Sequence, residues 1–109
     1  MNLSEYRMMW IYVMFDLPTD TKMARKSYSI FRKNLIKDGF TMVQYSVYER
    51  FCPSKENAEV HTRRVENFLP PDGEVRVLVV TDKQYEKMKV FWGKLSRQKP
   101  PAPKQLELF

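Results

Sequence analysis

The stretch Met-Met-Trp-Ile-Tyr-Val-Met-Phe-Asp-Leu-Pro at residues 8–18 decides the fold that this sequence predicts. Its first eight residues are apolar on both faces of a strand and rich in aromatic side chains, which favours a buried central strand over a helix. Pro18 ends the strand, because proline cannot donate to a strand ladder and keeps Leu17 extended. Counting by two from Trp10 therefore places Asp16 on one sheet face, at the end of a buried strand.

The segment that follows predicts a strongly amphipathic helix, capped by Thr19 or Asp20 and reaching about Asp38, with Gly39 as its stop. Its apolar stripe, at helical spacing, consists of Ala24, Tyr28, Phe31 and Leu35, flanked by Met23 and Ile30. The other face is almost purely basic, since the segment holds six cations and two acids, a net charge of +4. These cations are Lys22, Arg25, Lys26, Arg32, Lys33 and Lys37.

Residues 40–51 predict two strands joined by a tight or bulged junction at residues 44–46, because a run of this length is long for one strand. A second helix is expected to begin after Ser54, its N-cap, and to reach about Leu69. The sequence Pro-Pro-Asp-Gly at residues 70–73 then predicts a turn.

Residues 74–81 give the strongest strand pattern in the chain, and residues 82–93 predict a short helix. The order strand–helix–strand–strand–helix–strand predicts an α+β fold, the ferredoxin-like split βαβ (βαββαβ) arrangement, with an antiparallel sheet and its helices on one face. In this arrangement we expect the first and last strands in the middle of the sheet, which agrees with their being the two most hydrophobic segments. Residues 1–96 are assigned to this single domain, and residues 97–109 to a basic, proline-containing tail that can add a strand to a partner.

The charge of the chain points to a polyanionic partner. Nineteen Lys and Arg face thirteen acids, which gives a net charge of +6 and a pI near 9.5. One Cys and one His exclude an internal disulfide framework and a zinc site. No apolar run is long enough to span a bilayer. Residues 1–7 are polar and do not have a signal peptide's layout, so we expect a soluble cytoplasmic protein.

Asp16 is the leading candidate for chemistry. A carboxylate that ends a buried strand is well placed to hold a hard divalent cation. The alternative role is local, in which Asp16 accepts backbone N–H bonds in the turn that follows. Asp20 and Asp82 are the nearest other acids, and both resemble helix caps. A lone carboxylate makes a poor metal site in a monomer, so the metal hypothesis requires a two-fold axis that brings a second Asp16 close.

The remaining polar candidates are weaker. The basic helix face suits phosphate contacts, or it is simply a solvated surface. The third strand does not carry the Gly-aromatic signature with which RNA-recognition domains of this topology stack bases. Tyr45 and Ser46 have no partner base and are interpreted as structural, as is His61. Cys52 is interpreted as a packing residue.

Three blocks of sequence together carry a family resemblance. They are Tyr-Val-Met-Phe-Asp-Leu-Pro at residues 12–18, Gly-Phe-Thr-Met-Val-Gln-Tyr-Ser-Val-Tyr at residues 39–48 and Gly-Glu-Val-Arg-Val-Leu-Val-Val-Thr at residues 73–81. In this order and at this chain length, they resemble the small CRISPR-associated adaptation proteins. Members of that family are described as metal-dependent endonucleases. In spacer integration they are the partner of the CRISPR integrase that does not catalyse the integration step. The resemblance covers residues 8–95.

The resemblance implies a ferredoxin-like homodimer in which Asp16 of both subunits shares a Mg²⁺ or Mn²⁺ and serves as the catalytic and metal-binding residue. It also implies an adaptor that sits between integrase dimers and binds double-stranded DNA through its basic faces. The tail is expected to contact an integrase subunit by strand addition. Its candidate residues are Leu106, Leu108 and Phe109.

The nuclease and the adaptor are functions of different classes, and we favour the adaptor as the main role. The nuclease would be a metal-dependent endonuclease or endoribonuclease, which leaves single-stranded RNA as a second substrate. Two alternatives on the same fold are an RNA-binding module and an mRNA-cleaving toxin. The toxin needs an acid or base beyond Asp16, and the sequence does not identify one.

Overall fold

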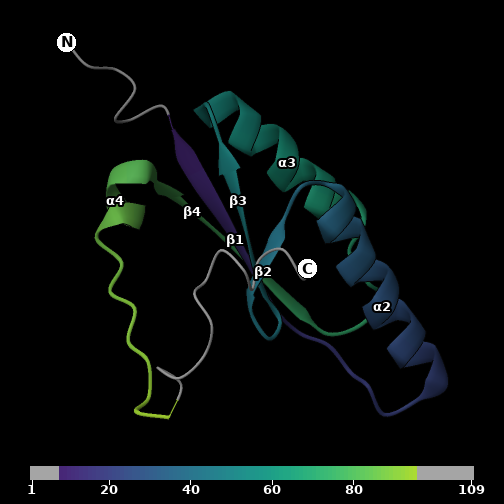
Figure 1. The fold of residues 1–109 in the computed structure, drawn as a ribbon. Helices are drawn as coiled ribbons and strands as arrows, with labels where there is room; N and C mark the ends of the chain where they lie inside the picture. The colour runs from purple at the N-terminus through teal and green to yellow at the C-terminus, as the bar shows by residue number, and fades with distance from the viewer. Residues whose placement is uncertain (1–7, 96–109) are drawn as a thin grey trace.

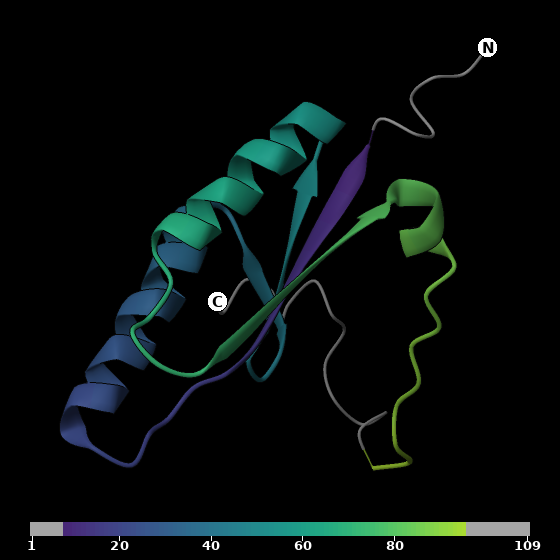
Figure 2. The same cartoon turned by 180° about the vertical axis from the view of Figure 1, so that it is seen from behind.

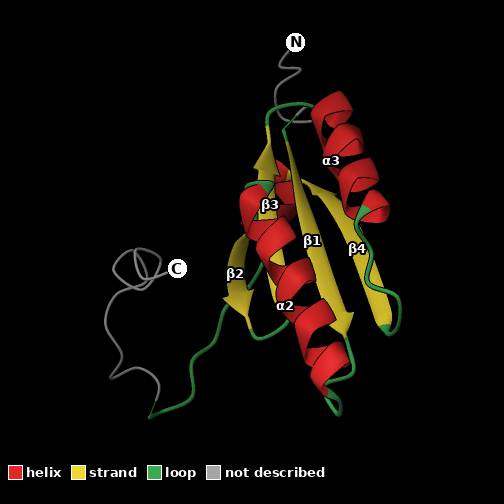
Figure 3. Ribbon diagram, turned by 90° about the vertical axis from the view of Figure 1, so that its right-hand side faces the viewer, coloured by secondary structure: helices red, strands yellow, loops and turns green. Residues whose placement is uncertain are grey.

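The computed structural model describes residues 8–95 and consists of one antiparallel sheet with two long helices packed on a single face (Figures 1 and 3). The strands are β1 (Met9–Asp16), β2 (Thr41–Gln44), β3 (Val47–Cys52) and β4 (Glu74–Thr81). The helices are α2 (Lys22–Lys37), α3 (Lys55–Asn67) and the short α4 (Asp82–Glu86). The predicted βαββαβ order and the one-sided helical layer are both confirmed.

The sheet order is β2-β3-β1-β4, with every neighbouring pair antiparallel. The expectation that the last strand lies in the middle is therefore wrong, because β1 and β3 are central and β4 is an edge strand. The apolar residues of β4 are not buried within this chain: Val77, Leu78 and Val79 are 38%, 51% and 38% exposed. In the view from behind in Figure 2, β4 is the green strand that runs from the loop after α3 to α4.

The core lies between the sheet and its two long helices. Alternate residues of β1, from Met9 through Ile11 and Val13 to Phe15, point to the helices and are buried. They pack with buried residues of both helices and of β3, which are Phe31, Leu35, Ala58, Val65, Tyr48 and Cys52. Burial also raises the pKa of the Cys52 thiol, so this side chain acts as a packing residue.

The boundaries of α2 differ slightly from the sequence prediction. Its N-cap is Thr21, whose side chain accepts a hydrogen bond from the Ala24 N–H at 3.0 Å, rather than Thr19 or Asp20. The chain leaves the helix at Gly39 with φ of +91°, as a glycine stop requires. Of the residues expected to flank the apolar stripe, Met23 is 78% exposed and Ile30 is 50% exposed.

The junction between β2 and β3 is a tight turn, as predicted. Ser46 has φ of +61°, and its carbonyl accepts the Phe15 N–H at 3.0 Å, which ties the turn to the end of β1. The Ser46 hydroxyl lies 3.1 Å from the Tyr28 hydroxyl. A register shift between Met42 and Gln44 adds a bulge to the adjoining strand. These contacts give the turn a structural role.

The second half of the fold follows the sequence with one correction. Helix α3 begins after Ser54, whose hydroxyl accepts the Asn57 N–H at 3.0 Å. Helix α4 is closed at its start by a capping box between Thr81 and Gln84. It ends at Glu86, so the expected helix over residues 82–93 is too long, and residues 87–95 follow without regular structure.

An ionic cluster around the buried carboxylate of Asp38 joins the end of α2 to α3. Asp38 accepts hydrogen bonds from His61 at 2.8 Å and from Arg64 at 2.9 Å, and its side chain is only 10% exposed. The expected structural role of His61 is therefore confirmed. Burial raises the pKa of the Asp38 carboxyl, but the hydrogen bonds and positive charge of His61 and Arg64 outweigh it and hold that pKa below its usual value.

Replacing Asp38 with Asn should destabilise the fold by about 1–3 kcal/mol at pH 7, because His61 and Arg64 lose their charged partner. Since the pKa of Asp38 is lowered on folding, its stabilisation is complete above the usual carboxyl pKa and disappears as the pH falls through the lowered one. Urea unfolding of the wild type and Asp38→Asn from pH 7 to pH 2.5 tests this. Glu66→Gln, on the exposed side of α3, is the control, and a pH-independent difference would contradict the assignment.

Candidate metal centre and nucleic-acid interface

Asp16 ends β1 on the sheet face that the helices leave uncovered, which we call the open face. Trp10, Tyr12 and Met14 precede it on this face and are half-buried, whereas Asp16 is exposed. The prediction of its face and strand-end position is confirmed. In the register of β1 with β4, Asp16 lies opposite Glu74, which places a second carboxylate on the open face beside it.

Glu74 is the site residue that sequence reasoning missed. It follows a turn 58 positions after Asp16, and only the strand pairing brings the two together. Its Oε1 accepts a hydrogen bond from Nε of Arg76 at 2.9 Å. Arg76 lies opposite Met14, one step further along the open face. The hydrogen bond and negative charge of Glu74 raise the pKa of Arg76, which therefore stays protonated.

The donor set at this strand end fits a hard divalent cation but does not complete a site. Carboxylate oxygens are the ligands that Mg²⁺ and Mn²⁺ prefer. Within residues 8–95, however, no three His, Cys, Asp or Glu side chains gather in one place. Asp82 does not contribute, because it follows the opposite end of β4, where its Oδ1 accepts the Trp10 indole N–H at 2.8 Å. A metal bound at Asp16 therefore needs ligands from water, nucleic acid or a second chain.

The turn before β4 approaches the backbone of Asp16 closely. Gly73 has φ of +97°, and a Cβ built on it would lie 2.8 Å from the Asp16 carbonyl oxygen and 2.6 Å from Cδ2 of Leu17. Only glycine fits this approach without moving the strand end. The Gly73 N–H also donates to Oδ1 of Asp72 at 2.8 Å, which closes the turn.

The opposite end of the open face holds an aromatic cluster that anchors α4. Tyr85 stacks on Trp10 with ring centroids 3.8 Å apart and an interplanar angle of 6°. The Tyr12 hydroxyl donates to Glu49 at 2.6 Å, and the Tyr85 hydroxyl donates to the same carboxylate at 3.3 Å. Burial, followed by the Glu49 hydrogen bond and charge, raises the pKa of Tyr12. These tyrosines therefore stay protonated, and their contacts anchor the start of α4 after β4.

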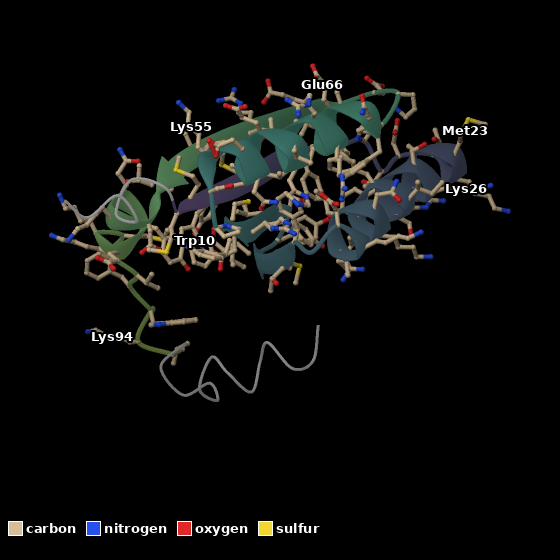
Figure 4. All side chains as sticks on the ribbon, turned by 90° about the horizontal axis from the view of Figure 1, so that it is seen from above. Trp10, Met23, Lys26, Lys55, Glu66 and Lys94 are labelled. Carbon is tan, nitrogen blue, oxygen red and sulfur yellow. The ribbon has the colours of Figure 1, made fainter. Side chains whose placement is uncertain are left out.

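The predicted nucleic-acid residues form an exposed basic strip along α2 with one exception. Lys22, Arg25, Lys26, Lys33 and Lys37 are exposed. Figure 4 shows Lys26 projecting outward at the end of the molecule farthest from Lys94. Arg32 is half-buried instead and interacts with the Tyr48 hydroxyl. Burial raises the pKa of Tyr48, and the charge and hydrogen bond of Arg32 oppose that rise. The expected partner residues Leu106, Leu108 and Phe109 lie outside the described residues.

Comparison with known proteins identifies the family. Residues 9–88 match the family described as CRISPR associated protein Cas2. The chain belongs to this family, which confirms the resemblance carried by the three sequence blocks. A Flavobacterium psychrophilum protein named CRISPR-associated endoribonuclease Cas2 is 52% identical over 108 residues, covering 99% of this chain and 94% of the relative. A Parvibaculum lavamentivorans protein of the same name is 55% identical over 101 residues, covering 93% and 100% respectively.

A solved structure described as the crystal structure of Cas2 supports the fold. It aligns with a TM-score of 0.58 and 17% identity over 87% of this chain and 97% of that one. In residues 8–95, none of the helices has the length and apolar character needed to cross a membrane.

The close approach of Gly73 to Asp16 generates a test of the strand end. Gly73→Ala should cost more stability than Gly39→Ala, by about 1–3 kcal/mol, because its Cβ meets backbone and Leu17, whereas a Cβ at Gly39 meets only the side chain of Arg50 at 3.1 Å. Both positions have positive φ, so the comparison isolates the steric contact. Thermal unfolding measures the difference, and equal losses would contradict the argument.

Proposed function

We propose that this protein is a homodimeric adaptor of CRISPR spacer acquisition that binds double-stranded DNA and bridges integrase dimers. We further propose that Asp16 gives it metal-dependent phosphodiester hydrolysis. The observation that carries the proposal is the uncovered apolar edge of β4, because it calls for a second chain beside the strand end that carries Asp16. The CRISPR family to which the chain belongs supports the integrase partner.

The case for a homodimer rests on apolar surface that one chain leaves open. Strand β4 has eight residues, pairs only with β1 within residues 8–95 and exposes its apolar side chains. Unprotected edges of this length are where another chain pairs. The segment after α4 adds Val90, Phe91, Trp92 and Leu95, which are 65%, 84%, 57% and 88% exposed. A second copy that covers both regions would remove these exposed apolar side chains from water.

The chemistry of the proposed nuclease follows from the residues at the strand end. Asp16 supplies carboxylate oxygens from a rigid strand, and its counterpart on a second chain would complete a symmetric pair. A bound Mg²⁺ or Mn²⁺ would lower the pKa of a coordinated water and neutralise charge that develops on the phosphodiester. Gly73 lets the turn approach the Asp16 backbone closely, and Glu74 adds a neighbouring carboxylate.

The basic strip of α2 supports the DNA-binding role. Five exposed cations on one helix face form a surface that can follow a phosphate backbone without reading bases. Two chains carry twice the net charge of +6, or +12, which predicts sequence-independent binding with strong salt dependence. The apolar tail residues Leu106, Leu108 and Phe109 are proposed to contact the integrase subunit by strand addition.

A ribonuclease activity is the second candidate function. Relatives that share about half of this sequence are named CRISPR-associated endoribonuclease Cas2. The same Asp16 centre would act on single-stranded RNA, because metal-assisted attack on a phosphodiester does not depend on the sugar. RNA and DNA substrates are therefore compared in the experiments below.

The dimer is tested at the edge strand. Leu78→Lys should convert the dimer into a monomer at micromolar concentration, since a buried lysine charge opposes pairing at β4. Sedimentation velocity measures the change. Val60→Lys on α3 is the control, because Val60 is 36% exposed but lies on the helical layer. A wild-type protein that sediments as a monomer would contradict the proposal.

The two roles are separated by paired substitutions. Asp16→Ala should abolish Mg²⁺-dependent cleavage of RNA and DNA while leaving duplex binding and spacer integration intact, because only the metal loses its ligand. Changing Lys22, Lys26, Lys33 and Lys37 to Glu should weaken duplex binding by about 100-fold at 0.1 M salt. Integration is assayed with the purified integrase.

Each outcome of this comparison assigns a role. Loss of integration in Asp16→Ala with an intact complex would make the metal chemistry central and overturn the adaptor assignment. Equal effects of both sets of changes would show that the two roles are not separable. Wild-type protein without Asp16-dependent cleavage would remove the nuclease from the proposal and leave the adaptor.

A further inference from the structure

Arg76 is the single cation among the strand residues on the open face within residues 8–95. The register places Trp10, Tyr12, Met14 and Asp16 of β1 opposite Val80, Leu78, Arg76 and Glu74 of β4 on that face. The β3 residues that share it are Val47, Glu49 and Phe51. Arg50, the neighbouring cation, faces the helices, since it pairs with Ile11 and donates from Nε to the Asp38 carbonyl at 2.9 Å.

Arg76 lies within reach of the strand end that carries Asp16. It is two residues from Glu74 along β4, a distance of about 7 Å in a strand. Its side chain is 71% exposed, so the guanidinium is open to a ligand. The Arg76 side chain thus stands beside the carboxylates rather than in the core or against the helical layer.

Glu74 orients the guanidinium while leaving its outer edge open. It accepts from Nε at 2.9 Å, and within the described residues no hydrogen bond occupies the two terminal nitrogens. Those nitrogens form the fork that binds two oxygens of a phosphate. An ion pair this exposed adds little to stability, because solvent screens both charges, so the arrangement gains little for the fold.

We propose that Arg76 binds nonbridging oxygens of the nucleic-acid phosphate held at the Asp16 centre, and that Glu74 is the positioning residue for its guanidinium. This inference rests on the proposed nuclease function and identifies a phosphate-binding residue for it. Arg76 would neutralise negative charge that increases on the phosphate oxygens in the transition state. It would also hold the backbone against Asp16 before any reaction.

The experiment compares Arg76→Ala, Arg76→Lys and the wild type as full-length protein. The probes are a fluorescent 20-nucleotide single-stranded RNA and a DNA duplex of the same length. We expect Arg76→Ala to lower the single-turnover rate at saturating nucleic acid and 10 mM Mg²⁺ by about 10²–10³-fold. Arg76→Lys, which keeps the charge without the fork, should be intermediate. Arg63→Ala, an exposed arginine on α3, should keep the wild-type rate.

A second readout does not require cleavage. The second readout is the salt dependence of the association constant, measured as the slope of its logarithm against the logarithm of salt concentration. In Arg76→Ala the magnitude of this slope should fall by about 0.7 for RNA or 0.9 for DNA for each Arg76 side chain that contacted a phosphate. Mn²⁺ binding, measured by electron paramagnetic resonance, should stay within about twofold of the wild type, because Arg76 is not a metal ligand. Sedimentation should still show a dimer.

Glu74 is tested separately as a positioning residue. Glu74→Gln keeps an oxygen acceptor for Nε of Arg76 and should retain most of the cleavage rate. Glu74→Ala should lose more of the cleavage rate, and its kcat should fall by a larger factor than its KM rises. Weaker Mn²⁺ binding in Glu74→Ala would make Glu74 a metal ligand and overturn the positioning role.

The outcomes distinguish this inference from the function on which it rests. A wild-type rate and an unchanged salt slope in Arg76→Ala would overturn the role of Arg76 while leaving Asp16-dependent cleavage in place. Dissociation of Arg76→Ala into monomers would make it an interface residue and would also overturn it. Absence of Asp16-dependent cleavage in the wild type contradicts the nuclease, and the salt slope then decides whether Arg76 contacts phosphate.

Discussion

The double pairing of β1 is the constraint on which the rest of the structure depends. This strand is bonded to β3 on one side and to β4 on the other, so its register fixes both neighbours. Because side chains alternate, one register decision places Ile11 and Val13 in the core and Asp16 on the open face. A slip by one residue would move the carboxylate under the helices. The candidate metal centre is therefore set by the same hydrophobic alternation that builds the core.

The charged groups divide into two kinds with different roles. Asp38 and His61 are largely buried and, together with the more exposed Arg64, form an ionic cluster that joins α2 to α3. The lysines of α2 and the pair of Glu74 and Arg76 remain open to solvent. Buried ionic groups must satisfy one another, whereas exposed ones keep their bonding capacity for partners. The charged side chains available to nucleic acid are therefore those that do not pair with one another inside the fold.

The sequence predicted the elements well because their signals are local. The apolar run that ends at Pro18, the cap at Ser54 and the turn before Gly73 each depend on neighbouring residues, and the structure contains all three features. Pairing between distant strands leaves no such signal. Glu74 was missed for this reason, and the expected place of β4 in the middle of the sheet was not questioned because its apolar sequence agreed with it. The length of helix α4 was overestimated. Its Tyr85 is held by a tertiary contact with Trp10, which helical periodicity does not reveal.

The strand order also governs when the protein can assemble as it is synthesised. Strand β1 emerges first and β4 last, and the Trp10 indole reaches its Asp82 partner across 72 positions of sequence. The central strand consequently stays unpaired along one side until nearly the whole described chain has left the ribosome. Contacts of such long range slow folding and leave an apolar edge exposed in the meantime. The pairing of β1 with β4 is therefore the last strand pairing of the sheet for which both partners become available during synthesis.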